Sequence, residues 1–244
     1  MKIIKLDAID STNTFLKELC HKNDVENLTV VIADDQTKGR GQMQSVWDSE
    51  IGKNLIFSIL IKFVPLEIEN QFYISKVISL AIHEFLASVL DKKICIKWPN
   101  DIVAEQKKIS GVLIENSVKK AKVHQSIVGI GLNVNQEVFN NLPNATSMKL
   151  VSNEDYILDD LLEKLVVSIK KYVSVLNDKN FNLIDKLYLE KLHKLNVPSM
   201  FKSRLTDSLF MGKIIGISKQ GLLKVELEDE SIRQFNLKEI TFLR

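Results

Sequence analysis

Short apolar runs and longer amphipathic stretches alternate along most of the chain. Runs rich in β-branched residues predict strands, and these runs lie at 2–6, 28–33, 55–63, 94–98, 109–115 and 126–134. Apolar residues at helical spacing predict a helix that starts after Asp10, a long core helix over 66–90, and amphipathic helices over 154–176 and 181–195. Residues 135–150 are polar and rich in turn formers, so we expect a surface loop there.

The pattern changes at about residue 197. Short alternating strands are predicted over 212–217, 222–227 and 232–237, with turn residues between them. Regularly spaced short strands of this kind indicate a small antiparallel barrel that forms a separate domain. We therefore expect two domains, at 1–196 and 197–244.

The composition is typical of a soluble globular protein. Its 244 residues are 45% hydrophobic, which is enough to bury a core. The 33 basic and 31 acidic side chains leave a net charge of +2 without a dense basic block, which argues against a nucleic-acid groove. The N-terminus lacks the pattern of a signal peptide, and no apolar run approaches the roughly 20 residues of a membrane span. We therefore expect a cytoplasmic protein that binds neither DNA nor membranes.

The cysteines and histidines do not form a recognisable site. Cys20 and Cys95 are far apart in apolar surroundings, which indicates buried reduced thiols in a reducing compartment. The four histidines lack metal-ligand spacing and fall within predicted helices or strands, so we assign them structural or surface roles: His21, His83, His124 and His193.

The densest group of candidate functional residues follows the predicted strand over 94–98. Residues 97–101 read KWPND, and the proline and asparagine turn the chain out of the strand. The next strand begins directly after Lys108, which brings this lysine back beside Asp101. A carboxylate and a cation at a strand end suit a phosphorylated ligand with its magnesium ion. The turn chemistry alone fits an ordinary hairpin with solvated charges at least as well.

Polar residues open the first predicted helix. Ser11, Thr12 and Asn13 supply hydroxyl and amide groups just ahead of its apolar positions. The simpler interpretation is a helix N-cap. The functional interpretation is a cup, made of these groups and the helix N-terminus, for a polar heterocycle or an anion.

A long loop over 34–44 separates the second and third predicted strands. It holds Arg40 between two glycines and leads to Trp47. Because the loop joins two strands, it is neither a Rossmann fingerprint nor a Walker loop. It can act as a lid that folds over an anionic ligand, or it is a mobile surface hairpin.

Two glycines interrupt the strand predicted over 126–134. Gly129 and Gly131 mark either a close approach of a ligand or another backbone, or a kink near a bulge. Asn133 then places an amide at the strand end, where it can hold a ribose or a phosphate oxygen.

Taken in order, these blocks resemble the biotin protein ligases. They are STN (11–13), QTKGRG (36–41) before Trp47, KWPND (97–101), KISGVLIE (108–115) and GIGLN (129–133), followed by the small terminal barrel. The resemblance covers nearly the whole chain. It implies an α+β fold, with a mixed β-sheet catalytic domain of the biotin/lipoate ligase type and a C-terminal SH3-like β-barrel.

The resemblance also implies an activity. Ligases of this family use ATP and Mg²⁺ to activate biotin as biotinyl-5′-AMP. They then transfer biotin to a lysine of a carrier domain, and the expected partner is the biotin carboxyl carrier protein of an acyl-CoA carboxylase. Sheet-edge homodimers are common in the family, and no feature of this sequence decides whether one forms.

Site residues follow from the matching positions. The resemblance implies that the biotin-binding residues are Ser11, Thr12, Asn13, Gln36, Arg40, Gly41, Gln42, Lys108 and Gly111. It places Trp47, Asn100, Gly131 and Asn133 on the nucleotide side. Arg40, Lys108 and Asp101 are the implied catalytic residues, and Asp101 is also the implied Mg²⁺ ligand.

The sequence departs from the resemblance in two ways. Many relatives carry a second arginine and a further glycine in the loop, where this chain has Gln42, Met43 and Gln44, so we expect different ordering of the loop and different retention of the adenylate. The chain also begins almost at the catalytic domain, without room for the helix-turn-helix module of some relatives, so we expect no operator binding.

Three other functions fit parts of the sequence. A lipoate or octanoyl ligase shares the catalytic fold but lacks KWPND. A non-catalytic biotin or nucleotide sensor would not need Arg40, Asp101 and Lys108 together. A nucleic-acid-binding protein fits poorly with the near-neutral charge.

Overall fold

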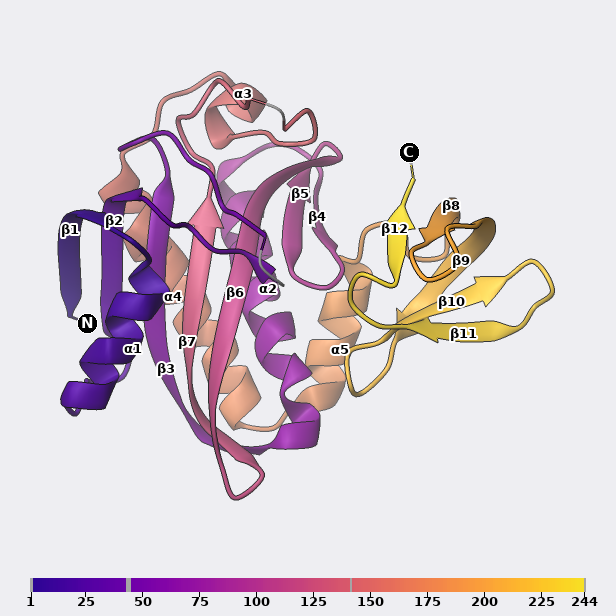
Figure 1. The fold of residues 1–244 in the computed structure, drawn as a ribbon, viewed down its shortest axis with the longest axis horizontal. Coiled ribbons are helices and arrows are strands. Elements are labelled where there is room, and N and C mark those ends of the chain that lie inside the picture. The colour runs from indigo at the N-terminus through magenta and orange to yellow at the C-terminus, as the bar shows by residue number, and fades with distance from the viewer. Residues whose placement is uncertain (1, 43–44, 141, 244) are drawn as a thin grey trace.

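A seven-stranded mixed sheet forms the centre of the molecule (Figure 1). The computed structural model describes residues 2–42, 45–140 and 142–243. The strand order is β1-β2-β3-β7-β6-β5-β4, and β1 runs parallel to β2 while the other neighbours are antiparallel. The strands are β1 (Ile3–Ile9), β2 (Val30–Gln36), β3 (Leu55–Glu67), β4 (Ile94–Lys97), β5 (Asp101–Ala104), β6 (Lys107–Lys119) and β7 (Lys122–Leu132).

Helices cover the two faces of this sheet unequally. The larger core packs one face against α2 (Phe72–Val89), α4 (Leu158–Asn177) and α5 (Phe181–Glu190). The opposite face carries α1 (Thr12–Lys22), whose Leu16 packs on Val31 of β2 in a smaller core. The alternation of side chains along β2 explains this division, because Val30 and Ile32 point to the larger core. Since α1 covers only part of its face, the rest stays open for a site.

Helix α2 is the buried centre of the helical layer. Together with the 3₁₀ turn η2 (Ile68–Asn70), it forms a described segment of 22 residues, Ile68–Val89, with a mean hydropathy of 1.4, long and apolar enough to cross a membrane by length and composition. By those two measures, the expectation that no segment reaches the length of a span is wrong. Yet 67% of the window is buried within the fold, as expected for a core helix.

A second, antiparallel sheet follows α5. Its order is β11-β10-β9-β8-β12, formed by β8 (Pro198–Ser203), β9 (Leu209–Ile217), β10 (Leu223–Leu227), β11 (Ile232–Phe235) and β12 (Ile240–Phe242). The ring of Phe201 is fully buried and stacks with the Phe210 ring at 5.6 Å between centroids. Within the described residues the sheet is open, with β11 and β12 at its edges, so the expected barrel is not closed.

The predicted fold class is confirmed, and several boundaries differ. The core helix starts at Phe72 instead of residue 66, because β3 continues to pair with β7 up to Glu67. Helix α5 stops at Glu190 because the backbone beyond it bonds to β4. The stretch expected to be a loop ends in the short helix α3 (Met148–Ser152), which the side chain of Ser147 caps. The sequence prediction missed β5, β8 and β12 and placed the start of α4 four residues early.

Candidate functional site

Two adjoining cavities lie on the open part of the sheet face that carries α1. The first, of about 310 Å³, reaches from the N-terminus of α1 to the end of β4. The second, of about 490 Å³, lies beyond it toward Phe139 and residues 142–145. The cavities share six lining residues, which form their junction: Val46, Trp47, Lys97, Asp101, Lys108 and Phe242.

Hydroxyl and amide groups line the far end of the first cavity. The backbone nitrogen and the hydroxyl of Thr12 donate to Gln36 Oε1 at 2.8 and 3.0 Å. Ser58, fully buried on β3, donates to Asn13 Oδ1 at 2.5 Å and lies 2.7 Å from Thr12 Oγ1. Ser11 is the N-cap residue of α1, but its side chain makes no capping bond, so its hydroxyl is available to a ligand. This end therefore offers fixed polar groups of the kind that recognise a neutral heterocycle.

Gly129 gives Asn13 the space that it occupies. A methyl group at Gly129 would lie 2.3 Å from Asn13 Oδ1. Asn13 also donates from Nδ2 to Glu115 Oε2 at 2.9 Å. The side chain of Asn13 is therefore held from three sides, by Ser58, Glu115 and the bare backbone of β7.

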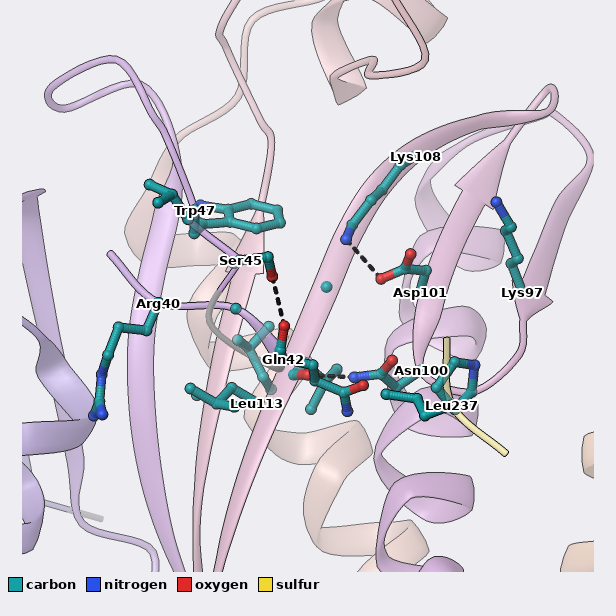
Figure 2. Close-up of a pocket in the computed structure, with 18 of the residues that line it drawn as sticks. Arg40, Gln42, Ser45, Trp47, Lys97, Asn100, Asp101, Lys108, Leu113 and Leu237 are labelled. Atoms are coloured by element: carbon teal, nitrogen blue, oxygen red, sulfur yellow. Dashed lines mark hydrogen bonds and ion pairs between the residues drawn. The ribbon is translucent and has the colours of Figure 1, made fainter. Parts of the chain in front are cut away.

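An ion pair stands at the junction of the cavities. Lys108 Nζ lies 2.6 Å from Asp101 Oδ1, so the two residues meet as the sequence predicted, and their side chains are 39% and 29% exposed (Figure 2). Strands β5 and β6 bring the two residues together. Asp101 of β5 pairs with Gly111 of β6, and Lys108 lies beside the bulge that interrupts the pairing of these strands. The partial exposure leaves both groups open to a charged ligand.

Side-chain bonds fix the KWPND turn from two neighbouring elements. The amide of Asn100, which is 4% exposed, donates to the carbonyl oxygen of Val112 on β6. Trp98 donates from Nε1 to the carbonyl oxygen of Gly221, in the turn between β9 and β10, at 2.9 Å. Asn100 is thus occupied in holding the turn.

The indole of Trp47 packs against the backbone of two glycines. Gly111 of β6 and Gly131 of β7 are direct strand partners. A methyl group at Gly131 would lie 2.3 Å from the indole, and one at Gly111 would lie 3.1 Å from it. Lys108 Nζ is 5.5 Å from the centre of the indole ring, across the junction (Figure 2). Gly131 therefore marks a close approach, as one of its two interpretations predicted, but the approaching group is the Trp47 side chain and not a ligand or another backbone.

Two buried polar atoms near the second cavity lack partners among the described residues. They are Asn133 Oδ1, an acceptor, and Trp47 Nε1, a donor. Asn133 Nδ2 is occupied, since it donates to the Thr146 carbonyl oxygen at 2.9 Å. An unpaired buried polar atom costs about 1–3 kcal/mol, and a ligand with complementary groups removes that cost.

The side chain of Arg40 is turned away from the ion pair. Arg40 Nη2 donates to Thr14 Oγ1 at 3.0 Å and lies 3.6 Å from Glu115 Oε2, and Figure 2 shows its guanidinium pointing away from Lys108. The structure therefore does not bring Arg40 and Lys108 together. Gly41 and Gln42 line the first cavity, whereas Met43 and Gln44 lie outside the described residues.

The part of the sequence that forms most of these elements matches a known protein family. Residues 6–133, slightly more than half of the chain, match the model of the biotin/lipoate A/B protein ligase family. The chain belongs to the biotin/lipoate A/B protein ligase family. It is 30% identical over 233 residues to the bifunctional ligase/repressor BirA of Bacillus spizizenii, with 93% of this chain and 70% of that protein covered. It is 31% identical to the chloroplastic biotin–protein ligase 1 of Arabidopsis thaliana, with 85% and 58% covered.

A solved member of the ligase family has the same architecture. The biotin protein ligase from Aquifex aeolicus, in complex with biotin and ATP, superposes with a TM-score of 0.80 at 29% identity. The match covers 100% of this chain and 99% of that one. The likeness therefore extends over both sheets.

Sequence reasoning missed two members of the ligase site. Ser58 contacts Thr12 and Asn13, and Glu115 contacts Asn13 and Arg40. A signal existed for Ser58, which is a polar residue on the apolar strand β3. Glu115 closes the KISGVLIE block, but nothing in the sequence revealed its partners.

A metal ion at this ligase site would be bound by few protein side chains. Among the residues that the structure describes, no group of three or more His, Cys, Asp and Glu side chains is arranged to hold an ion. Asp101 and Asp48 line the second cavity. One or two carboxylates completed by substrate phosphates and water are a usual environment for Mg²⁺, so the residues fit that ion.

Proposed function

We propose that this protein is an ATP-dependent biotin–protein ligase. It joins biotin to AMP and then transfers the biotinyl group to a lysine of a biotin carboxyl carrier domain. The observation that carries the proposal is the position of Lys108, whose ammonium stands at the junction of a cavity lined by amides and hydroxyls and a second, larger cavity. Two substrates bound in these cavities would meet at Lys108.

In the first step a carboxylate oxygen of biotin attacks the α-phosphorus of ATP. The new oxygen–phosphorus bond creates a mixed anhydride. The bond from the α-phosphorus to the oxygen that bridges to the β-phosphate breaks, so that pyrophosphate leaves. Two anions approach each other in this step, and Lys108 offsets their repulsion. Its ammonium is held ready by Asp101 at 2.6 Å.

In the second step the amine of the carrier lysine attacks the acyl carbon of the adenylate. An amide bond forms, the bond to AMP breaks, and the amine gives up a proton. This step requires no enzyme nucleophile. The anhydride hydrolyses in water, so the loop that carries Arg40, Gly41 and Gln42 is proposed to cover it and exclude solvent.

The proposed biotin contacts all line the first cavity, whereas the proposed nucleotide contacts come from both cavities, with Asn100 and Gly131 in the first and Asn133 in the second. Ser11, Thr12, Asn13, Gln36 and Gly111 hold biotin, together with Arg40, Gly41, Gln42 and Lys108. The nucleotide contacts Trp47, Gly131, Asn100 and Asn133. For Arg40 this role requires the guanidinium to leave Thr14 and Glu115 when ligands bind. The unpaired Asn133 Oδ1 supports the nucleotide assignment, because the amino group of adenine can donate to it.

Mg²⁺ is proposed to enter with the nucleotide. Asp101 would hold it, with Asp48 as a further carboxylate near the same cavity. When bound, the ion would neutralise negative charge on the phosphate oxygens.

We infer that the partner is the carrier protein of an acyl-CoA carboxylase and that a homodimer is compatible with the exposed edge strand β1. The free thiols of Cys20 and Cys95 are compatible with a reducing cytoplasm.

The test is transfer of labelled biotin to a purified carrier domain in the presence of ATP and Mg²⁺, comparing the wild type with Lys108→Ala. The proposal expects labelling and pyrophosphate release that both depend on Lys108. Biotin binding without pyrophosphate release would favour a sensor, and labelling with lipoate in place of biotin would favour the other branch of the family.

A further inference from the structure

A chain of hydrogen bonds runs along the amide-lined end of the first cavity. It joins Glu115 to Asn13 at 2.9 Å, Asn13 to Ser58 at 2.5 Å, and Ser58 to Thr12 at 2.7 Å. Asn13 and Thr12 line the cavity, whereas Glu115 and Ser58 line neither cavity. Glu115 and Ser58 therefore reach a ligand at this end only through the two residues that line it.

Glu115 leaves the side-chain amide of Asn13 one orientation. Its carboxylate lies between two cations, with Lys17 Nζ and Arg40 Nη2 each 3.6 Å from one of its oxygens. A carboxylate accepts hydrogen bonds and donates none, so the Asn13 atom that faces it is the donor Nδ2. The other end of the amide, the acceptor Oδ1, is thereby turned toward Ser58.

The amide orientation in turn fixes the hydroxyl protons. Asn13 Oδ1 can only accept, so the single hydroxyl proton of Ser58 goes to it. The contact of 2.7 Å between the hydroxyls of Ser58 and Thr12 then takes its proton from Thr12. Gln36 Oε1, which lies 3.0 Å from the same Thr12 hydroxyl, is an acceptor as well. Whichever of these atoms takes the proton, Thr12 Oγ1 meets the cavity as an acceptor.

Without the carboxylate, the chain has two possible directions. A reversed Asn13 amide presents Nδ2 to Ser58, which frees the Ser58 proton for Thr12 and the Thr12 proton for the cavity. Ser58 is fully buried, and Thr12 and Asn13 are each 3% exposed, so bulk water cannot decide between the two directions. The fixed charge at the end of the chain decides between them.

We infer that Glu115 is a positioning residue for the biotin end of the site, where it fixes the direction of these hydrogen bonds so that Thr12 offers an acceptor to an N–H group of the ligand. The inference rests on the proposed function. The ureido ring of biotin carries N–H groups, whereas the dithiolane ring of lipoate carries none. A ring without a donor leaves the buried Thr12 oxygen without a partner, and the site thereby disfavours it.

The test exchanges the amide and the carboxylate between positions 13 and 115 and measures biotin binding to the whole chain by calorimetry without ATP. Glu115→Gln keeps the shape but can face Asn13 with either end of its amide, so biotin affinity is expected to fall about 10-fold. Asn13→Asp sets two carboxylates face to face, and biotin affinity is expected to fall about 100-fold or more.

The double variant Asn13→Asp/Glu115→Gln restores a pair of one amide and one carboxylate. The new amide at position 115 donates to the new carboxylate at position 13, whose other oxygen still accepts from Ser58. Biotin affinity is therefore expected to recover by about 10-fold or more over Asn13→Asp alone. A merely structural role of Glu115 gives no such reciprocal rescue.

Controls separate this route from the contact between Glu115 and Arg40. Thr14→Val removes the hydrogen-bond partner of Arg40 without touching Asn13, and is expected to leave biotin affinity within about twofold of the wild type. The KM for ATP is measured by biotin-dependent exchange of labelled pyrophosphate into ATP at saturating biotin, and is expected to be unchanged in Glu115→Gln. Urea denaturation checks that each variant is folded.

The outcomes decide the inference as follows. Biotin affinity in Glu115→Gln that stays within about twofold of the wild type overturns it, and so does a double variant that binds no better than Asn13→Asp. A loss in Thr14→Val as large as that in Glu115→Gln assigns the effect to Arg40 and overturns it as well. If the wild type itself does not bind biotin, the proposed function is wrong instead.

Discussion

The hydroxyl of Tyr188 donates a hydrogen bond of 2.9 Å to the carbonyl oxygen of Pro99. Tyr188 is a fully buried residue of α5, and Pro99 belongs to the turn that ends in Asp101. Helix α5 thus supports the turn from behind, while Asn100 is held from β6. The position of the Asp101 carboxylate depends on this support.

Tyr188→Phe tests that dependence. The substitution keeps the ring and leaves the Pro99 carbonyl oxygen without its donor, so the free energy of unfolding is expected to fall by about 1–3 kcal/mol. The exchange rate of pyrophosphate is expected to fall as well, because Asp101 is less firmly placed. Chemical denaturation and the exchange assay measure the two effects. Tyr172→Phe is the matched control, since its hydroxyl bonds to Glu84 at 2.9 Å on the helical layer. Equal exchange rates in the two variants would contradict the prediction.

Lys108→Ala is expected to lower the rate of adenylate formation by about 100-fold or more, because a cation that meets the developing charge is removed. Lys107→Ala removes the neighbouring, exposed lysine and is expected to behave like the wild type. Single-turnover formation of biotinyl-5′-AMP measures both variants. A loss of only a few fold for Lys108→Ala would place the centre of the reaction elsewhere.

Gly129→Ala and Gly131→Ala are expected to damage different substrates, although the two glycines share one strand. The new methyl group at Gly129 would meet Asn13, and the one at Gly131 would meet Trp47. We therefore expect weaker biotin binding from the first variant and a higher KM for ATP from the second, as measured by calorimetry and by exchange. In a Trp47→Ala background Gly131→Ala should have little further effect, because the obstructed ring is gone. A further loss in that background would show that the contact is not the cause.

Gln42→Arg is expected to slow the release of biotinyl-5′-AMP from the enzyme. Gln42 lines the first cavity, and a cation at this place would attract the phosphate of the adenylate. Release is measured by trapping free adenylate after a single turnover. The same release rate in both proteins would argue that Gln42 does not govern retention.

We expect His83 to make the free energy of unfolding depend on pH. Burial lowers the pKa of its imidazole below 6.5, and Nε2 lies 3.1 Å from the Ile94 carbonyl oxygen. As the pH falls below 6.5, the unfolded chain binds a proton at His83 before the folded chain does, so stability is lost in that range. His83→Gln should therefore lose less stability than the wild type between pH 7.5 and pH 5.5 in urea titrations. An equal loss in both proteins would assign the pH dependence to other groups.

The sequence predicted those parts of the site whose residues lie close together in the chain. Asp101 and Lys108 meet as expected, because a hairpin with a short connection fixes their separation. Partners that come from distant segments were not predictable in the same way. Ser58 and Glu115 come close only through the pairing of β3, β7 and β6, and both contact Asn13 of helix α1.

The elements that were missed have a related cause. Strand β12 has three residues, too few to show an alternation, and β8 begins at Pro198, a residue that argues against a strand. The end of α5 at Glu190 is set by tertiary bonds to β4 and not by local helix propensity. That same departure carries His193 out of the helix in which it was expected and into the cavity wall.

The second cavity takes part of its wall from Phe242 and Leu243, which are synthesised after all the other residues that line it. A ribosome-bound chain can therefore form the large sheet and the amide-lined end of the first cavity well before this wall exists. Under the proposed function, nucleotide binding in the second cavity is therefore expected only after β12 has emerged and docked. A nascent chain in which the last strand is still missing lacks part of the wall of both cavities.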